Sequence, residues 1–379
     1  MVSAECGRLV SGALGATMDE QSLTSQPEVG VVQESASQRV DVIVRSVGTA
    51  SPRIAGAIAR GTGIPIEAVV DSLYRAPARL VANLEPHSAE KFRALLIELG
   101  IEAELAPAGQ QMERTQLFDV AAELRDPLQI DEVVSAVSLF LGCATDEAQR
   151  LLLEPPGVLL GRVSAATVAA LELALPAGAV ELVAVDPDAE QYTLFAAGLS
   201  RSELAAIQPL LPDGTEINED GTLTVFDLSR QAADSIWRRA RHCPSLRVVH
   251  QAFLRFDISL QAAPVEGAEH LSALAGVPTD LYPQLLQALP VVIEERLRLT
   301  EVRERMLAYA SAGFRTAASL TTFSQVSLDV LTAPRDALAA VGLQGREAPL
   351  RIPAMSPARA RVVRAKLEAR GASVEVASL

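Results

Sequence analysis

The side chains best suited to chemistry in this chain are its four histidines and three cysteines. The histidines are far apart in the sequence: His87, His242, His250 and His270. No two of them have the spacing of a metal-binding motif. The cysteines, Cys6, Cys143 and Cys243, are odd in number and contain no CxxC pair. We therefore expect no metal site, no cofactor and no framework of structural disulfides.

The motifs that could support catalysis are incomplete. No GxSxG sequence is present, and residues 59–64, ARGTGI, lack the GK[ST] ending of a phosphate-binding loop. Carboxylate pairs such as Glu294 with Glu295 could act as acid and base, but without a predicted pocket they are better interpreted as solvated turns and strand edges. We expect no catalytic residues and a non-enzymatic protein. An enzyme with a cleft between modules is the remaining alternative.

Charge and composition limit the classes of partner. The formal net charge of −14 opposes attraction to nucleic acid or to an anionic membrane. No apolar stretch reaches the roughly 20 residues that span a bilayer, and the N-terminus has only Arg8 as a positive charge before residue 22. We expect other proteins as partners, no membrane insertion and a cytoplasmic location. The sequence does not indicate an oligomeric state.

The elements that must position these side chains form a repeat. Five similar phrases of Gly or Ser followed by alternating apolar residues begin at Gly100, Gly178, Ser245, Gly313 and Gly371. Their spacings of 78, 67, 68 and 58 residues indicate duplicated modules. Apolar residues make up 49 % and aromatic residues only 4 %, so the cores must consist of Ala, Val, Leu and Ile. Cores of this kind suit small, thin-layered domains.

The predicted fold class is α+β, with five tandem small α/β sandwich modules. Three have the order β-α-α-β-α-β, and two are shortened to β-α-β-α-β. A tail at 1–37, rich in Ser, Gln and Glu and without strand or helix periodicity, precedes them and is expected to be disordered. The full modules are predicted at 38–109, 114–187 and 254–324, and the shortened ones at 190–253 and 326–379.

The first module contains clear signals for a strand and for helix ends. Val40, Val42 and Val44 alternate as in a strand, and Ser51 before Pro52 predicts the start of a helix. The later helix has an apolar stripe, and Gly100 stands where its C-terminal cap is expected. The stripe consists of Phe92, Leu95, Leu96 and Leu99.

Residues 39–107 resemble the C-terminal domain of the bacterial ribosomal stalk protein, whose fold is shared with the Clp protease adaptor. The resemblance rests on DVIV, RIAGAIARGTGI, IEAVVDSL, the Ala76-Pro77 turn, SAEKFRALLIELG and IEAEL, in that order. It implies that the paired helices form a protein-binding surface. The matching positions here carry Arg53, Arg60, Ile66 and Val70, with less positive charge than the lysine-rich surface of the stalk family.

Two further segments are locally basic on an acidic chain. They are predicted either to dock an acidic partner or to form solvated helix faces that balance neighbouring carboxylates. Their candidate residues are Trp237, Arg238, Arg239, Arg241, Arg361 and Arg364. The leading hypothesis is a bacterial scaffold or adaptor within a larger assembly. The alternative is a proteostasis or translation adaptor that recruits a Clp unfoldase or a translation factor.

Overall fold

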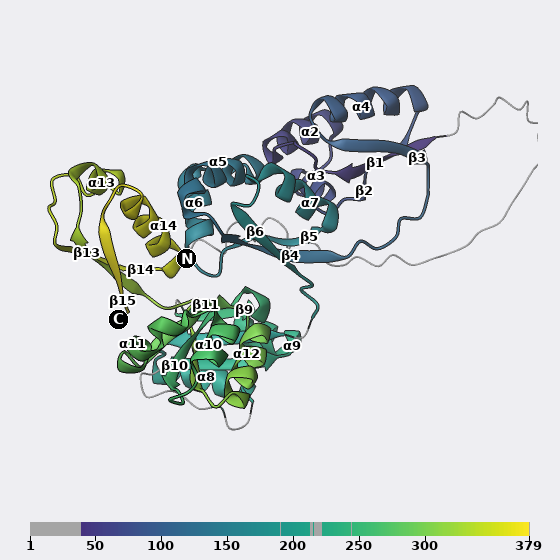
Figure 1. Ribbon diagram of the computed structural model, residues 1–379. Helices are drawn as coiled ribbons and strands as arrows, with labels where there is room; N and C mark the ends of the chain where they lie inside the picture. The colour runs from purple at the N-terminus through teal and green to yellow at the C-terminus, as the bar shows by residue number, and fades with distance from the viewer. Residues whose placement is uncertain (1–38, 190, 213–214, 216–221, 244, 379) are drawn as a thin grey trace, which may run out of the picture. The chain divides into compact units, whose positions relative to one another are not determined.

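The protein is described by a computed structural model covering residues 39–189, 191–212, 215, 222–243 and 245–378. The predicted tail at 1–37 lies outside the described residues. Within them the chain forms five three-stranded antiparallel sheets with accompanying helices (Figure 1). The predicted mixed α+β class is therefore confirmed.

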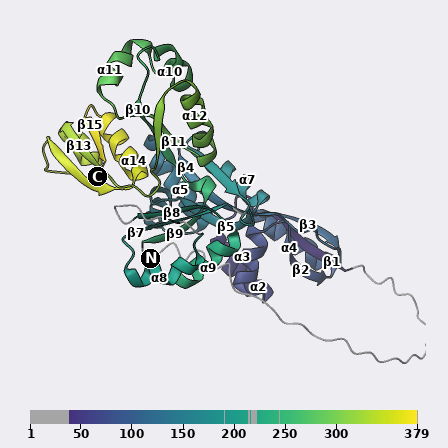
Figure 2. The same ribbon diagram turned by 90° about the horizontal axis from the view of Figure 1, so that it is seen from below.

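Three segments of the chain have the full order of elements. The first comprises β1 (Val40–Ser46), α2 (Ala55–Thr62), α3 (Ile66–Tyr74), β2 (Ala78–Leu84), α4 (Pro86–Glu98) and β3 (Glu102–Pro107). The second comprises β4 (Leu117–Leu124), α5 (Ile130–Leu141), α6 (Thr145–Leu153), β5 (Val158–Ser164), α7 (Ala165–Ala174) and β6 (Val180–Val185). The fourth comprises β10 (Phe256–Ala262), α10 (Ala268–Ala275), α11 (Tyr282–Gln287), β11 (Val291–Leu297), α12 (Leu299–Ser311) and β12 (Arg315–Leu320). Figure 2 shows α10, α11 and α12 beside β10 and β11.

In the described parts of two segments, a single α-helix lies between the first and second strands. The third comprises β7 (Tyr192–Ala197), α8 (Arg201–Ile207), β8 (Thr222–Leu228), α9 (Arg230–Ala240) and β9 (Leu246–His250). The fifth comprises β13 (Val326–Thr332), α13 (Arg335–Ala340), β14 (Leu350–Met355), α14 (Pro357–Glu368) and β15 (Ser373–Ser378). In the fifth, α13 is followed by a turn rather than by a second helix.

In every sheet the first strand is central. The strand orders are β2-β1-β3, β5-β4-β6, β8-β7-β9, β11-β10-β12 and β14-β13-β15. Both faces of β1 are buried, since Asp41 and Ile43 are as inaccessible as Val42 and Val44. The second and third strands are always the outer ones, and each keeps one edge that no other strand of the described residues pairs with.

A bulge recurs near the end of the second strand. Asn83, Arg162, Asp227 and Arg296 have φ between 56° and 61°, in the left-handed region that side chains other than glycine rarely adopt. In the first segment Asp41 Oδ1 accepts the Asn83 N–H at 2.9 Å. In the fourth, Asp257 Oδ1 accepts the Arg296 N–H at 2.8 Å. An aspartate on the central strand thus holds the bulge in both segments.

The glycines that open the closing phrases have a common backbone role. Gly100, Gly178, Gly313 and Gly371 all have φ between 73° and 86°. Gly100 ends the turn after α4, as predicted, and a Cβ there would lie 2.5 Å from Thr49 Oγ1. The repeated phrase therefore marks a left-handed turn from helix to closing strand. In the stripe predicted for α4, Leu96 is fully buried, whereas Leu95 is 48 % exposed, so the apolar face is narrower than expected.

The chain divides into two compact units, and the second segment contributes to both. Unit 1 comprises residues up to Phe118 with Ser135–Thr145 and Leu160–Leu175. Within it Thr167 Oγ1, fully buried, donates to the Tyr74 carbonyl at 2.8 Å, and Tyr74 Oη donates to the Phe140 carbonyl at 3.0 Å. Unit 2 comprises Asp119–Val134, Asp146–Leu159 and Pro176–Leu379. Separate apolar cores lie in its third, fourth and fifth segments, including those around Ile236, Tyr309 and Leu367.

No single helix in the described ranges is both long and apolar enough to cross a bilayer. One sharply bent pair, residues 127–141 with Thr145–Leu153, passes the same test by length and composition only.

Candidate functional site

The predicted partner-binding residues of the first segment lie on α2, on α3 and just before α2. The Arg53 guanidinium approaches the carbonyls of Gly142 and Cys143 at 3.4 Å each, within unit 1. Arg60 and Ile66 are both exposed, and both approach Gly56. Val70 is half-buried. Arg60 and Ile66 thus form an open surface, whereas Arg53 contacts the end of α5.

The basic residues of the third segment remain open to solvent. Trp237 is 43 % exposed, and Arg238, Arg239 and Arg241 are exposed beside it on or after α9. Ile236 and Ala240 of the same helix are buried in the core. The helix therefore presents its indole and guanidinium groups on the face opposite its core.

The basic residues of α14 lie in different environments. Arg364 is exposed and pairs with Glu368 one turn along the helix, at 2.7 Å. Lys366 pairs with Asp131 at 3.0 Å. Arg361 instead donates to the Leu124 carbonyl of the second segment at 2.5 Å, and both residues belong to unit 2. Two of these cations are balanced by carboxylates, and the third, which is half-buried, takes part in a partly buried cluster.

The described residues contain no group of three or more His, Cys, Asp or Glu side chains able to hold a metal. Glu294, one of the carboxylates considered above, accepts a hydrogen bond from Tyr309 Oη and pairs with Arg305 Nε at 3.3 Å. Burial, followed by Glu294, raises the pKa of the Tyr309 phenol. Glu295 beside it is exposed. The two carboxylates therefore face different environments, and Glu294 has structural partners.

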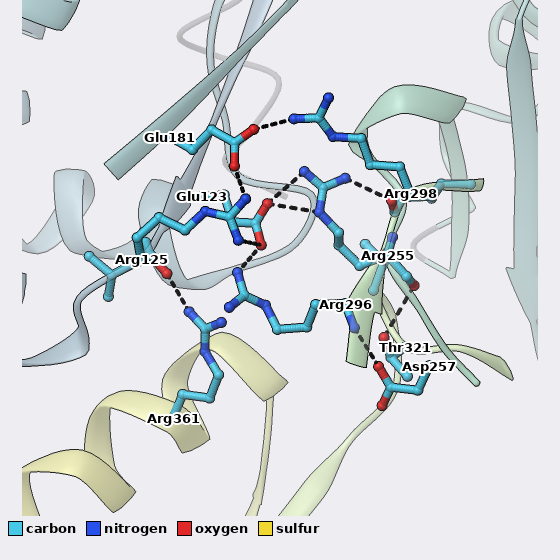
Figure 3. Close-up of polar contacts among 12 residues, drawn as sticks. Glu123, Arg125, Glu181, Arg255, Asp257, Arg296, Arg298, Thr321 and Arg361 are labelled. Atoms are coloured by element: carbon cyan, nitrogen blue, oxygen red, sulfur yellow. Dashed lines mark hydrogen bonds and ion pairs between the residues drawn. The ribbon is translucent and has the colours of Figure 1, made fainter. Parts of the chain in front are cut away.

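A cluster of five arginines and two glutamates lies within unit 2 (Figure 3). Glu123 of β4 is at its centre: Arg255 Nε and Nη2 lie 2.8 and 2.6 Å from Glu123 Oε2. Arg296 of β11 pairs with the other oxygen of Glu123. Glu181 of β6 pairs with Arg125 and Arg298. Arg361 completes the set, and we call these seven residues the arginine cluster.

The arginine cluster is crowded with positive charge. Burial and the neighbouring Arg298 lower the pKa of Arg255 to about 10. Burial and Arg125 lower the pKa of Arg361 as well, and the charge of Glu295 opposes this. Asp257, which holds the Arg296 bulge, has its pKa raised to about 6 by burial and by Glu295, against a hydrogen bond from Thr321. The guanidinium groups exceed the carboxylates in contact with them, five against two.

Sequence reasoning found only one member of this cluster, Arg361. The sequence signal that could have indicated the cluster is a charged residue inside an apolar strand. Glu123 is such a residue, because it lies between Ala122 and Leu124, which are both buried. Such a charge needs a counter-charge when it is buried. The pattern in one strand could not identify partners 132 residues away, as Arg255 is from Glu123.

A small pocket of about 110 Å³ adjoins the arginine cluster within unit 2. Its apolar wall includes Ala121, Val183 and Phe253, which pack together. Arg255, Arg296 and Arg361 also line it. The pocket thus combines a short apolar wall with guanidinium groups.

The outer strand β12 has the longest run of exposed residues of any outer strand in the described residues. Three successive residues, Ala317, Ala318 and Ser319, are exposed, which occurs in no other outer strand. Each of the other outer strands carries a charged residue or a proline inside it, such as Glu104 in β3 or Pro353 in β14. In β12 the only charge is at the first residue, Arg315. Charges and prolines on edge strands discourage strand addition, and β12 lacks them.

Comparison of the chain with protein-family models, curated proteins and solved structures gives no match.

Proposed function

We propose that the protein is a non-enzymatic scaffold or adaptor that binds an extended segment of a partner protein along the free edge of β12. The observation that carries this proposal is the uncharged and exposed outer edge of that strand. An extended peptide can add to such an edge through main-chain hydrogen bonds. The repeated modules and the exposed surfaces of α2, α3 and α9 offer further contacts to the same or other partners.

The register of β10 and β12 identifies which residues would donate. Thr321 N donates to the Arg255 carbonyl at 2.9 Å, so the main chain of Thr321 points toward β10. Directions alternate along a strand, and Asp257 pairs with Ser319 and Ile258 with Ala318. The N–H and carbonyl of Ala318 therefore point away from β10 and are available to an added strand.

The resemblance to the ribosomal stalk C-terminal domain is consistent with this proposal, because that family recruits proteins. We propose the stalk-like fold for the full modules on the order of their elements and on the motifs of residues 39–107. Recruitment of a Clp unfoldase or of a translation factor would be a narrower form of the same function.

The test is to compare partners of three forms of the full chain in the native cell. Ala318→Pro removes the outward N–H without removing a bond to β10, whereas the control Ala318→Val keeps that N–H and favours a strand. We expect proteins cross-linked stoichiometrically to the wild type and to Ala318→Val to be lost from Ala318→Pro. In the purified complex, amides of residues 315–320 should exchange more slowly than in the free protein.

Three results would contradict the proposal. One is an identical partner set for Ala318→Pro, and another is a complex that leaves the amides of residues 315–320 unprotected. The third is self-association of the purified wild type through β12, measured by sedimentation, because it would make the edge an interface between copies. Circular dichroism of both variants checks that the fold is retained.

A further inference from the structure

The arginine cluster contains one cation without a counter-ion. Arg255 and Arg296 pair with Glu123, and Arg125 and Arg298 pair with Glu181. Arg361 has no ion pair among the described residues, and its single hydrogen bond is to the Leu124 carbonyl. Its Nε is buried without an acceptor. Figure 3 shows its guanidinium directed from α14 toward Arg125 and Arg296.

This arrangement is costly without an anion. A buried charge is normally paired, and an unpaired buried polar donor loses its hydration without compensation. Glu123 and Glu181 are already shared among four arginines. Glu154 at the pocket, Glu295 and Glu301 are the other carboxylates that bear on this region, and among the described residues none of them forms an ion pair with Arg361. The charge of Arg361 therefore remains to be balanced.

The size and lining of the pocket beside Arg361 indicate which kind of anion could balance its charge. Its volume of about 110 Å³ is somewhat below that of a cavity of roughly 150 Å³ that holds benzene. Ala121, Val183 and Phe253 supply an apolar wall, which suits an aliphatic group of about four or five carbons better than an inorganic anion. A planar carboxylate matches the fork of a guanidinium.

We propose that this pocket binds a free short-chain aliphatic carboxylate, with its charge balanced by Arg361 and its apolar chain against Val183 and Phe253. The site is built from β4, β6, the region of β10 and β11, and α14, all within unit 2. A bound carboxylate contacts elements of the second, fourth and fifth segments together. It therefore stabilises the packing of α14 on the rest of unit 2. This site is independent of the β12 edge.

Calorimetric titration of the full chain with isovalerate tests the proposal, with isoamyl alcohol as the neutral analogue and inorganic phosphate as the purely polar anion. We expect saturable binding of isovalerate only. Arg361→Gln should weaken it about 10- to 100-fold, the range for loss of a charge-assisted pair. The control Arg364→Gln, three residues along the same helix and exposed, should leave it unchanged. Hydrogen exchange of residues 357–368 should slow when isovalerate is added to the wild type.

Equal binding of the alcohol, binding of phosphate alone, or an unchanged affinity in Arg361→Gln would overturn the proposal. So would the absence of saturation by tens of millimolar isovalerate. If Arg361→Gln does not fold, Arg361→Lys provides the second variant. It keeps the charge but not the fork, and we expect it to retain part of the affinity. Because isovalerate and isoamyl alcohol are compared on the wild type, equal affinity for the two compounds refutes the site even if neither variant folds.

Discussion

The charge of Glu123 should be the main electrostatic support of the arginine cluster, and Glu123→Gln isolates that charge. Glutamine keeps the shape and one oxygen acceptor but leaves Arg255 and Arg296 without their carboxylate. The side chains of Glu123 and Arg255 are only 12 % and 13 % exposed, so water replaces little of the lost interaction. Breaking a buried ion pair by removing one partner costs about 3–5 kcal/mol. We take the lower end, about 3 kcal/mol, because the amide oxygen still accepts and Arg296 is 27 % exposed.

Hydrogen exchange measured by mass spectrometry on the full chain reports this cost locally. A loss of about 3 kcal/mol corresponds to roughly 100-fold faster exchange for amides that exchange through opening of β10 and β11. The matched control is Asp329→Asn in the fifth segment. Arg351 donates to Asp329 twice at 2.6 Å, but it is 62 % exposed. Exchange in β13 should therefore change little, as expected for a surface pair.

The result that would refute this reasoning is exchange in β10 and β11 within threefold of the wild type for Glu123→Gln. The arginines would then be stabilised by water or by main-chain carbonyls, such as those of Ala252 and Leu254 that accept from Arg255, rather than by Glu123. The double variant Glu123→Gln with Arg296→Gln provides a second check. It removes one excess cation and should exchange more slowly than Glu123→Gln alone.

Two further predictions concern single positions. The pKa of Asp257 rises from 3.8 to about 6 on folding, so the native state retains a proton that the unfolded state releases. The stability that protonated Asp257 contributes to the native state is fully present below pH 4 and is lost as pH rises through 6. Between pH 5 and 7 the opening free energy of β11 should fall by about 1 kcal/mol in the wild type, relative to Asp257→Asn. Equal pH slopes for the two proteins, from exchange corrected for intrinsic rates, would contradict the role of burial. Separately, Gly157→Ala should cost about 2–4 kcal/mol, because φ is +74° and a Cβ would lie 2.8 Å from the Ala122 carbonyl oxygen. Gly178→Ala, with φ +73° and open space, should cost only about 1 kcal/mol. Similar thermal destabilisation of both variants would rule out the steric contribution.

The repeat was accessible from sequence because each of its parts has a local cause. Ser51 accepts the Arg53 N–H at the start of the first helical turn, with Pro52 at its first position, as predicted. The glycines of the closing phrases have the left-handed conformation that explains their presence. The third and fifth modules were likewise predicted to be shorter and to keep one central helix, because less chain lies between their strand signals. These signals depend on a few neighbouring residues, so they survive divergence of the modules.

The candidate sites were less accessible. Leu95 was expected in the apolar stripe of α4 but is exposed, because helical spacing alone does not fix the width of the face that a sheet covers. Arg361 and Arg364 looked equivalent in a basic helix. Arg361 enters a partly buried cluster and Arg364 pairs on the surface, and only the neighbours of α14 distinguish them.

The sequence by itself determined five modules, their α+β class and the turns that close them, since these follow from local periodicity and backbone preference. Tertiary structure alone decided that the first strand of every sheet is central and that β12 keeps an open edge. It also decided that Glu123, Arg255, Arg296 and Arg361 meet, although they are distributed over 239 positions of the chain. Long-range pairing depends on which surfaces the modules bury against one another, and no short segment carries that information.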